Sequence, residues 1–334
     1  MQVHEAVEGF LLDCQVRGLS ERTIEWYRQK LSYLADWLQE QKVVSLERVT
    51  TLHLRTFVQQ VQQTDAHANN PKKPTLSGRK VSAFTLKGYT QTMKTLFRWC
   101  VAEGLLEKDP SARLARPKLP RYLIPTLSVE QIEALMGACD STTAIGFRDQ
   151  LILLLLLDTG VRVSELCGLK LRDVHEDYIV VTGKGSKQRE IGISPILSKY
   201  LWKYVRLYRK PVDSAQQQLL LSYRGLPLAV ETVDDILAEI RSRAGLNGVR
   251  VSPHVFRHTF ARTYLAKGGD VYKLSRLMGH TGVEVTQIYL KDVQAAEARQ
   301  GQADLSPLES LDIGKRKRGH WRGFQGKKSR EAGD

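Results

Sequence analysis

Cysteine is scarce in this sequence of 334 residues. Its four cysteines, Cys14, Cys100, Cys139 and Cys167, lie far apart and lack the spacing of metal ligands. Isolated thiols of this kind are typical of a reducing compartment. We therefore expect free core cysteines, no metal and a cytoplasmic protein.

Signals for export or membrane insertion are also missing. The opening MQVHEAVEGF lacks the basic and then apolar pattern of a signal peptide. The apolar run at 151–157 (LILLLLL) is far shorter than the roughly 20 residues that cross a bilayer. The run predicts a buried core helix, and we expect no membrane partner.

Acidic residues are too few to balance the basic ones. Lys and Arg number 50 against 36 Asp and Glu, which gives a formal charge of +14 and a pI near 9.6. This balance favours a polyanionic partner, most often nucleic acid. A ribosomal-type or membrane-surface role would fit the charge equally well, so charge alone does not choose between them.

The length and the order of sequence patterns predict two domains. Residues 1–106 read as helical, with apolar residues three or four apart in each segment and starts at Ser20, Thr50 or Thr51, and Ser82. Inside them, the polar stretch 65–81 predicts a loop. Residues 107–125 hold four prolines and five basic residues, which predicts a stiff linker that runs along phosphates.

Residues 126–305 predict a second, mainly helical domain. Ser128 and Gln131 form a capping box, and Ser164 is expected to cap a short helix after Gly160. The segments 177–182 and 189–193 read as a β-hairpin, followed by helices over 195–209 and 231–244. A last helix is expected over 293–303. Residues 306–334 predict a basic, disordered tail, because 314–330 carries eight Lys and Arg and no acid.

The stretch 252–290 gathers residues that suit phosphodiester chemistry. His254, Arg257 and His258 fall at i, i+3 and i+4 and share one face of a helix that Ser252 and Pro253 begin. Gly268-Gly269 ends that helix, Asp270 can cap the next, and Gly279 ends it just before His280; Tyr289 follows on a short helix. There is no carboxylate pair to hold a metal.

A phosphodiester can be attacked without a metal if guanidinium groups neutralise its oxygens and side chains move the protons. Tyrosine suits the nucleophile because phenolate both attacks and leaves, so the covalent step is reversible. Each residue also has an ordinary interpretation. A histidine near a helix start is usually a cap or a satisfied polar contact, and a tyrosine after an apolar run is usually core.

The segment Thr159–Leu166 (TGVRVSEL) makes the chemical interpretation specific. It resembles the T-G-x-R-x-[ST]-E-L motif of the tyrosine recombinase family, which includes phage integrases and Xer-type recombinases. The family's H-x-x-R motif matches His254 to Arg257, and its L-G-H motif matches 277–280, with Met278 inserted. Its nucleophile matches Tyr289, and its hairpin lysine matches Lys184. The likeness is strong over 127–292 and looser before it.

The resemblance implies roles for these residues. Arg162 and Arg257 would hold the scissile phosphate, and Tyr289 would form a 3′-phosphotyrosyl link. Lys184 would protonate the leaving 5′-oxygen, His254 would handle the tyrosine proton, and His280 would donate a hydrogen bond to the phosphate. Glu165 could pair with Arg162 or orient it, or could orient a histidine, and His258 would be structural. No metal or nucleotide cofactor is implied.

The resemblance also implies a DNA clamp made of a helical core-binding domain and a catalytic domain. Its partners would be double-stranded DNA and further copies of the chain, two on one site and four in synapsis. Whether an accessory protein takes part is left open. We expect phosphate contacts from basic residues of the loop, linker and hairpin: Lys72, Lys73, Arg79, Lys80, Lys87, Arg116, Lys118, Arg121, Lys187 and Arg189.

Several functions share these residues. The basic tail and the 65–81 loop favour an integrase or transposase of a mobile element over an Xer-type enzyme that resolves chromosome or plasmid dimers. A type IB topoisomerase uses the same constellation but relaxes DNA as a monomer. A basic helical DNA-binding protein without chemistry is the rival from another class.

Overall fold

The computed structural model describes residues 1–66, 68, 76–120, 124–280, 282–290 and 293. The chain divides into two compact units, Met1–Tyr122 and Leu123–Asp334, and the division falls inside the segment 107–125. The basic tail and all of the expected last helix except Val293 lie outside the described residues. So do three of the predicted phosphate contacts: Lys72, Lys73 and Arg121.

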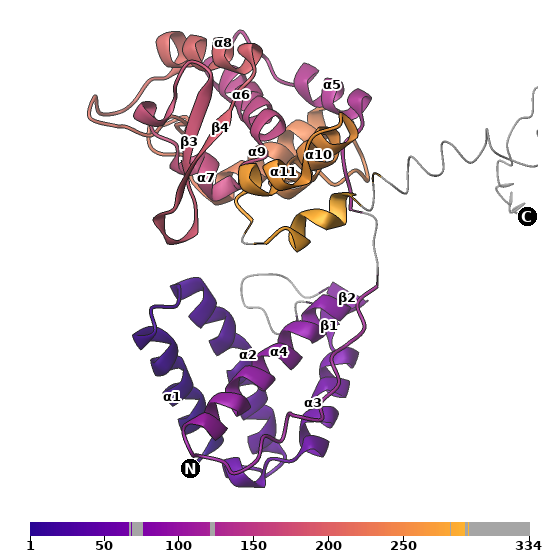
Figure 1. Ribbon diagram of the computed structural model, residues 1–334. Helices are drawn as coiled ribbons and strands as arrows, with labels where there is room; N and C mark the ends of the chain where they lie inside the picture. Colours follow the sequence, from indigo (N-terminus) through magenta and orange to yellow (C-terminus); the bar gives the residue numbers. More distant parts are fainter. Residues whose placement is uncertain (67, 69–75, 121–123, 281, 291–292, 294–334) are drawn as a thin grey trace, which may run out of the picture. The chain divides into compact units, whose positions relative to one another are not determined.

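Helices form most of the first unit, as the sequence predicts (Figure 1). Their apolar faces meet in one core around Leu31, Phe57 and Phe97, all fully buried. The hydroxyl of Ser82 accepts a hydrogen bond from the backbone of Thr85, which fixes one helix start. The elements are α1 (Val3–Val16), α2 (Glu21–Glu40), η1 (Leu46–Arg48), α3 (Thr51–Gln63) and α4 (Ala83–Ala102).

The stretch 65–81, predicted as a loop, has paired ends. The strands β1 (Asp65–Ala66) and β2 (Leu76–Lys80) are antiparallel, with Asp65 opposite Lys80. An ion pair of 2.9 Å joins the Lys80 Nζ atom to an Asp65 carboxylate oxygen. The loop prediction was therefore wrong at both ends, because its Pro- and Asn-rich signal comes from the middle of the stretch.

The start of the segment 107–125 packs against the first unit. The Thr51 hydroxyl donates to the carbonyl of Pro110 at 2.7 Å, and Lys94 Nζ donates to the carbonyl of Ser111 at 2.8 Å. Leu114 is buried in the core of this unit. These contacts fix the segment as far as Leu114.

The second unit is built around α6 (Ala144–Thr159). Five apolar residues of its 151–157 run have no exposed surface, so the run is the core helix that the sequence predicts. No helix among the described residues is long and apolar enough to cross a membrane. The other elements in this unit are α5 (Val129–Gly137), α7 (Val163–Gly168), η2 (Leu171–Asp173), β3 (Tyr178–Thr182), η3 (Lys184–Ser186), β4 (Gln188–Gly192), α8 (Pro195–Lys203), η4 (Tyr204–Tyr208), α9 (Val230–Arg243), α10 (Pro253–Ala266) and α11 (Val271–Met278).

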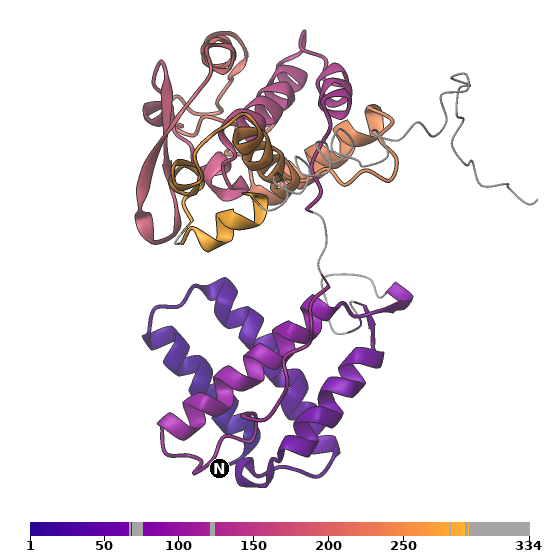
Figure 2. The same ribbon diagram turned by 45° about the vertical axis from the view of Figure 1, so that its right-hand side comes forward.

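The predicted β-hairpin is present as β3 and β4, which pair antiparallel from Tyr178 opposite Gly192 to Thr182 opposite Gln188. Its turn is η3, where Gly185 has φ of 72° and Ser186 has φ of 57°. The four cysteines are free, and three of them are buried. Figure 2 shows the last described helical turns, residues 284–290, beside α10 and α11.

One predicted helix start was wrong. Arg162, not Ser164, is the N-terminal capping residue of α7. The backbone N–H of Arg162 donates to the Glu165 carboxylate at 2.9 Å, so a side chain three residues later satisfies the exposed donor. Ser164 lies inside the helix.

Gly160 ends α6 in the left-handed conformation, with φ of 59°. A Cβ atom there would lie 2.3 Å from the ring of Phe260, whereas one at Gly245, with φ of 67°, would meet nothing. We expect Gly245→Ala to cost about 1–2 kcal/mol for the left-handed backbone. Gly160→Ala should cost about 1–3 kcal/mol more because of the clash. Urea unfolding of both variants measures the difference, and equal losses would contradict the steric argument.

Candidate active site

Two arginines meet at the ends of two helices in the second unit. Arg162 donates from Nη2 to the carbonyl of Gly279 at 2.9 Å. Arg257, which is 5% exposed, donates to the carbonyl of Gly160 at 2.6 Å and to that of Met278 at 2.5 Å. Gly160 and Gly279 are the left-handed C-caps of α6 and α11, so both guanidiniums lie where helix dipoles favour positive charge.

The buried guanidinium of Arg257 remains charged in this arrangement. Burial lowers the pKa of Arg257 to about 10, and the nearby charge of Arg162 adds to this effect. That value still leaves Arg257 protonated at neutral pH. Arg162 keeps 37% of its side chain exposed, so it can reach a bound anion. A phosphate at this point would meet two cations already held in place.

The buried carboxylate of Glu165 binds two arginines of this cluster. Its side chain is 2% exposed and accepts hydrogen bonds from Arg162 and Arg189. Burial raises the pKa of Glu165, but the hydrogen bonds from Arg189 and Arg162 outweigh it and bring the pKa to about 2. The carboxylate therefore stays ionised. Of the roles expected for Glu165, pairing with Arg162, orienting it or orienting a histidine, the structure shows the contact with Arg162.

Arg189 points inward, although the sequence suggested a phosphate contact. Its Nη1 and Nη2 atoms each lie 2.8 Å from a Glu165 oxygen, and its Nε atom donates to the carbonyl of Leu277 at 2.7 Å. Its side chain is 15% exposed. Arg189 thus ties β4 to both α7 and the end of α11.

His280 follows Gly279 and faces Arg257. Its Nε2 atom lies 3.1 Å from Nη2 of Arg257, and its Nδ1 atom lies 2.8 Å from the Thr286 hydroxyl. Burial and the charges of Arg257, Arg162 and Arg189 lower the pKa of His280 to about 4. A guanidinium can only donate, so the neutral ring accepts at Nε2 and carries its proton on Nδ1. Donation to a phosphate would require His280 to exchange this partner.

Tyr289 is 6% exposed and packs among apolar residues of α10 and α11. Its hydroxyl lies 2.6 Å from Nδ1 of His258. His254, one turn earlier on the same helix face, is exposed, and its ring centre is 6.5 Å from that of His258. This contact was not predicted from the sequence, since the family resemblance makes His258 structural and assigns the tyrosine proton to His254.

A cleft of about 1090 Å³ opens beside these residues. Its walls include Arg162, His280, the exposed Lys187 and Arg276, an exposed cation that was not predicted as a site residue. Lys184 lies at the start of η3, on the hairpin whose residues 182, 183 and 187–189 line the cleft.

Among the described residues, no three His, Cys, Asp or Glu are grouped so as to hold a metal.

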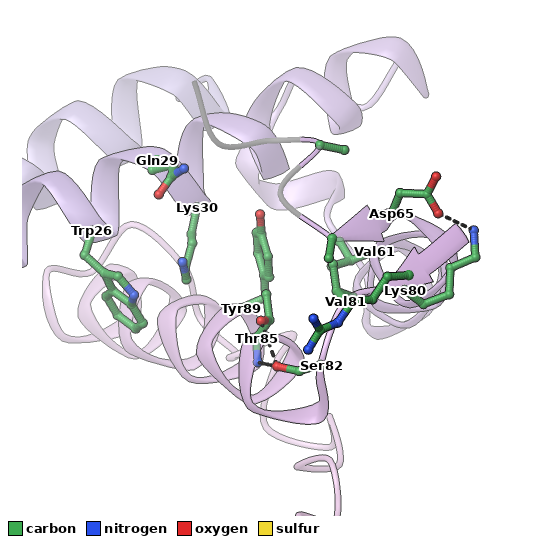
Figure 3. A pocket seen from close by; sticks show the side chains of 13 residues that line it. Trp26, Gln29, Lys30, Val61, Asp65, Lys80, Val81, Ser82, Thr85 and Tyr89 are labelled. Atoms are coloured by element: carbon green, nitrogen blue, oxygen red, sulfur yellow. Dashed lines mark hydrogen bonds and ion pairs between the residues drawn. The ribbon is translucent and has the colours of Figure 1, made fainter. Parts of the chain in front are cut away.

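The first unit has a separate basic pocket of about 440 Å³ (Figure 3). Lys30 stands between two rings, with Nζ 4.7 Å from the centre of Trp26 and 5.1 Å from that of Tyr89. Burial lowers the pKa of Lys30. The predicted contacts Arg79 and Lys80 line the same pocket. The other described residues of the first unit with this predicted role are exposed: Lys87, Arg116 and Lys118.

Removal of the Arg189 charge should weaken the whole cluster. We expect Arg189→Gln to lower the free energy of unfolding by about 3 kcal/mol, the lower end for breaking a buried ion pair, because Arg162 still faces Glu165. The matched control is Arg172→Gln. Arg172 lies 3.9 Å from Asp173 with 75% of its side chain exposed. Its loss should cost less than about 1 kcal/mol. Denaturant unfolding measures both, and similar losses would contradict a central role for Arg189.

The chain matches two known sequence families along most of its length. Residues 125–295 match the "Phage integrase family", and residues 7–104 match "Phage integrase, N-terminal SAM-like domain". The Tyrosine recombinase XerD of Lacticaseibacillus casei is 31% identical over 293 residues, which covers 86% of this chain and 94% of the relative. That of Proteus mirabilis is 33% identical over 277 residues, covering 82% and 83%.

Solved structures agree on the fold. A lambda integrase dimer bound to a COC' core site matches with a TM-score of 0.66 at 20% identity, covering 86% of this chain and 77% of the other. The XerH site-specific recombinase bound to palindromic difH substrate matches with a TM-score of 0.68 at 18% identity, covering 86% and 81%. With the family matches and the relatives above 30% identity, these results show that the chain belongs to the phage integrase family of tyrosine recombinases.

Proposed function

We propose that this tyrosine recombinase cuts and rejoins double-stranded DNA at specific sites, with Tyr289 as the nucleophile. The observation that supports this most is the convergence of Arg162 and Arg257 on the carbonyls of two helix ends, with His280 beside them. Two fixed cations next to an open cleft suit a phosphodiester whose charge grows in the transition state.

In this mechanism, Arg162 and Arg257 bind the non-bridging oxygens of the scissile phosphate. The Tyr289 oxygen attacks phosphorus, the bond to the 5′-oxygen breaks, and a 3′-phosphotyrosyl link forms. Lys184 supplies a proton to the leaving oxygen, and His280 donates a hydrogen bond to the phosphate from Nε2 once it releases Arg257 and takes the other tautomer. The resemblance assigns the tyrosine proton to His254. The step uses no metal or nucleotide, because the covalent link keeps the bond energy for rejoining.

The DNA would contact both units. The pocket with Lys30, Arg79 and Lys80 suits phosphates, and Lys187 and Arg276 extend the positive charge at the cleft. Related structures include a lambda integrase dimer on a core site, a lambda integrase tetramer on a Holliday junction, and the Tn1549 transposon integrase with circular intermediate DNA. By analogy, two copies of this chain would occupy one site and four would form the synapse.

Two biological roles fit this chemistry. The basic tail and the 65–81 loop of the sequence favour the integrase or transposase of a mobile element. Relatives named XerD and XerC, which cover most of the chain, favour the alternative, Xer-type dimer resolution, and we propose that role, in the cytoplasm. The DNA that flanks the gene would distinguish them, since terminal repeats would mark a mobile element.

Replacement of the nucleophile tests the reaction directly. Tyr289→Phe removes only the phenolic oxygen, so it should bind duplex DNA as tightly as the wild type but form no covalent complex with a nicked suicide duplex. Denaturing gels that detect protein-linked DNA measure this. A Phe variant that still becomes linked would move the nucleophile to another tyrosine, and a wild type that never links would favour a DNA-binding protein without chemistry. Strand exchange between two duplexes would separate a recombinase from a topoisomerase.

The role of Lys184 has its own test. Lys184→Ala should slow cleavage of ordinary DNA by about 10²–10⁴-fold, the usual effect of losing a general acid. A substrate with sulfur at the 5′-bridging position leaves as a thiolate and needs no proton. The Ala variant should therefore cut it nearly as fast as the wild type does. Equal impairment on both substrates would point to Lys187 or a histidine instead.

A further inference from the structure

The hydroxyl of Tyr289 has one hydrogen-bond partner among the described residues, and that partner is His258. Their separation, 2.6 Å between Oη and Nδ1, is short for a contact of a neutral phenol and a ring nitrogen. The tyrosine ring is held by a cluster of apolar residues, with Ala261, Leu274 and Met278 fully buried around it. The tyrosine is therefore held at its ring by the apolar cluster and at its hydroxyl by His258.

Helix geometry explains why His258, rather than His254, meets the tyrosine. The two histidines are four residues apart on α10, so their rings lie on one face, one turn from each other. Ala261 and Leu265, three and seven residues after His258 on the same face of α10, pack in the cluster around Tyr289. His254 lies in the first turn, where it is exposed and has no hydrogen bond within the described part of the chain.

We propose that His258, through Nδ1, is the group that takes the proton from Tyr289 when the phenolic oxygen attacks phosphorus. This inference rests on the proposed function and changes one role within it. The bond between Oη and phosphorus forms, and the bond between phosphorus and the 5′-oxygen breaks. The phenol proton moves to Nδ1 of His258, while Lys184 protonates the 5′-oxygen. On rejoining, His258 returns its proton to Oη as the phosphotyrosyl bond breaks.

The surroundings of His258 keep it ready to accept. Burial lowers its pKa to about 4, and the charges of His254, Arg257 and Arg250 act in the same direction. The ring is thus neutral at physiological pH, and with its proton on Nε2 the Nδ1 atom can accept from the hydroxyl. Within the described part of the chain, Tyr289 is the titratable group that is hydrogen-bonded to His258.

Tyr289 needs such an acceptor. Burial raises the pKa of its hydroxyl above the usual value, and Arg257 offsets part of this rise. The phenol is therefore protonated before attack, and the proton must leave as the bond to phosphorus forms. A neutral imidazole at 2.6 Å is already within transfer distance.

Two substitutions at position 258 separate proton transfer from positioning. Asparagine places an oxygen near the position of Nδ1, so His258→Asn can still accept the hydrogen bond but cannot take the proton; His258→Ala loses both. We expect each variant to form the covalent complex about 10²–10⁴-fold more slowly in single turnover. We also expect the wild-type rate to fall as acid protonates His258, and both variants to lose this part of the fall.

Two controls complete the experiment. His175→Asn alters a histidine that stacks on Tyr178 with ring centres 4.2 Å apart and should leave the rate unchanged. His254→Asn should keep the acid fall, whatever its effect on rate. A more acidic fluorotyrosine at position 289 should restore much of the rate in His258→Asn, because a weaker acceptor then suffices. DNA affinity and melting temperature establish that each variant is folded.

The outcomes are distinct. His258→Asn with a rate near that of the wild type would show that His258 only holds the tyrosine and would overturn the proposal. A faster rate in both variants would overturn it as well, because the contact would then restrain the nucleophile. If only His254→Asn loses the fall in rate at acid pH, His254 is the group that accepts the tyrosine proton, and the proposal is overturned. If the wild type forms no covalent complex, the proposed function fails, and this inference fails with it.

Discussion

The site depends on one buried carboxylate. Glu165 is almost fully enclosed yet ionised, and two guanidiniums share its oxygens. A lone buried carboxylate would be very costly, and so would a lone buried arginine, so the cluster is stable only as a set. The members of the cluster come from α7 and β4. The same ion pairs therefore hold these two elements together and fix the positive charge at the cleft.

Helix ends supply the rest of the framework. Gly160 and Gly279 stop two helices in the left-handed conformation, and the carbonyls freed there accept hydrogen bonds from Arg257 and Arg162. These groups are dipoles fixed by the backbone, so the guanidiniums need no reorganisation before a phosphate arrives. The same contacts leave His280 neutral and bound to Arg257, a state that must change on binding.

Local patterns in the sequence were sufficient to predict most elements of the fold. The apolar run of α6, the hairpin of β3 and β4 and the capping box at Ser128 all appear as predicted, because each depends on residues close in the chain. The family resemblance supplied the six expected catalytic positions. The arginine pair, His280 and Tyr289 lie in one unit, and the side chain of Lys184 is outside the described part.

Contacts between distant residues could not be predicted. Arg189 looked like a phosphate ligand because a basic hairpin residue usually faces solvent, but its direction depends on Glu165, 24 residues away. The contact between His258 and Tyr289 spans 31 residues, and Lys30 joins a pocket only through the packing of α2 against α4. Even Ser164, a good capping residue, gave way to Arg162, because a buried carboxylate was the stronger acceptor.

Gly279 contacts both arginines that bind Glu165. A Cβ there would lie 2.9 Å from Nη1 and 3.0 Å from Cζ of Arg189, while its own carbonyl holds Arg162. Any side chain at this position would push on the arginine that ties the hairpin, α7 and α11 together. The glycine and Arg189 therefore constrain each other, and a larger residue at position 279 would disturb the hairpin and the cation cluster at once.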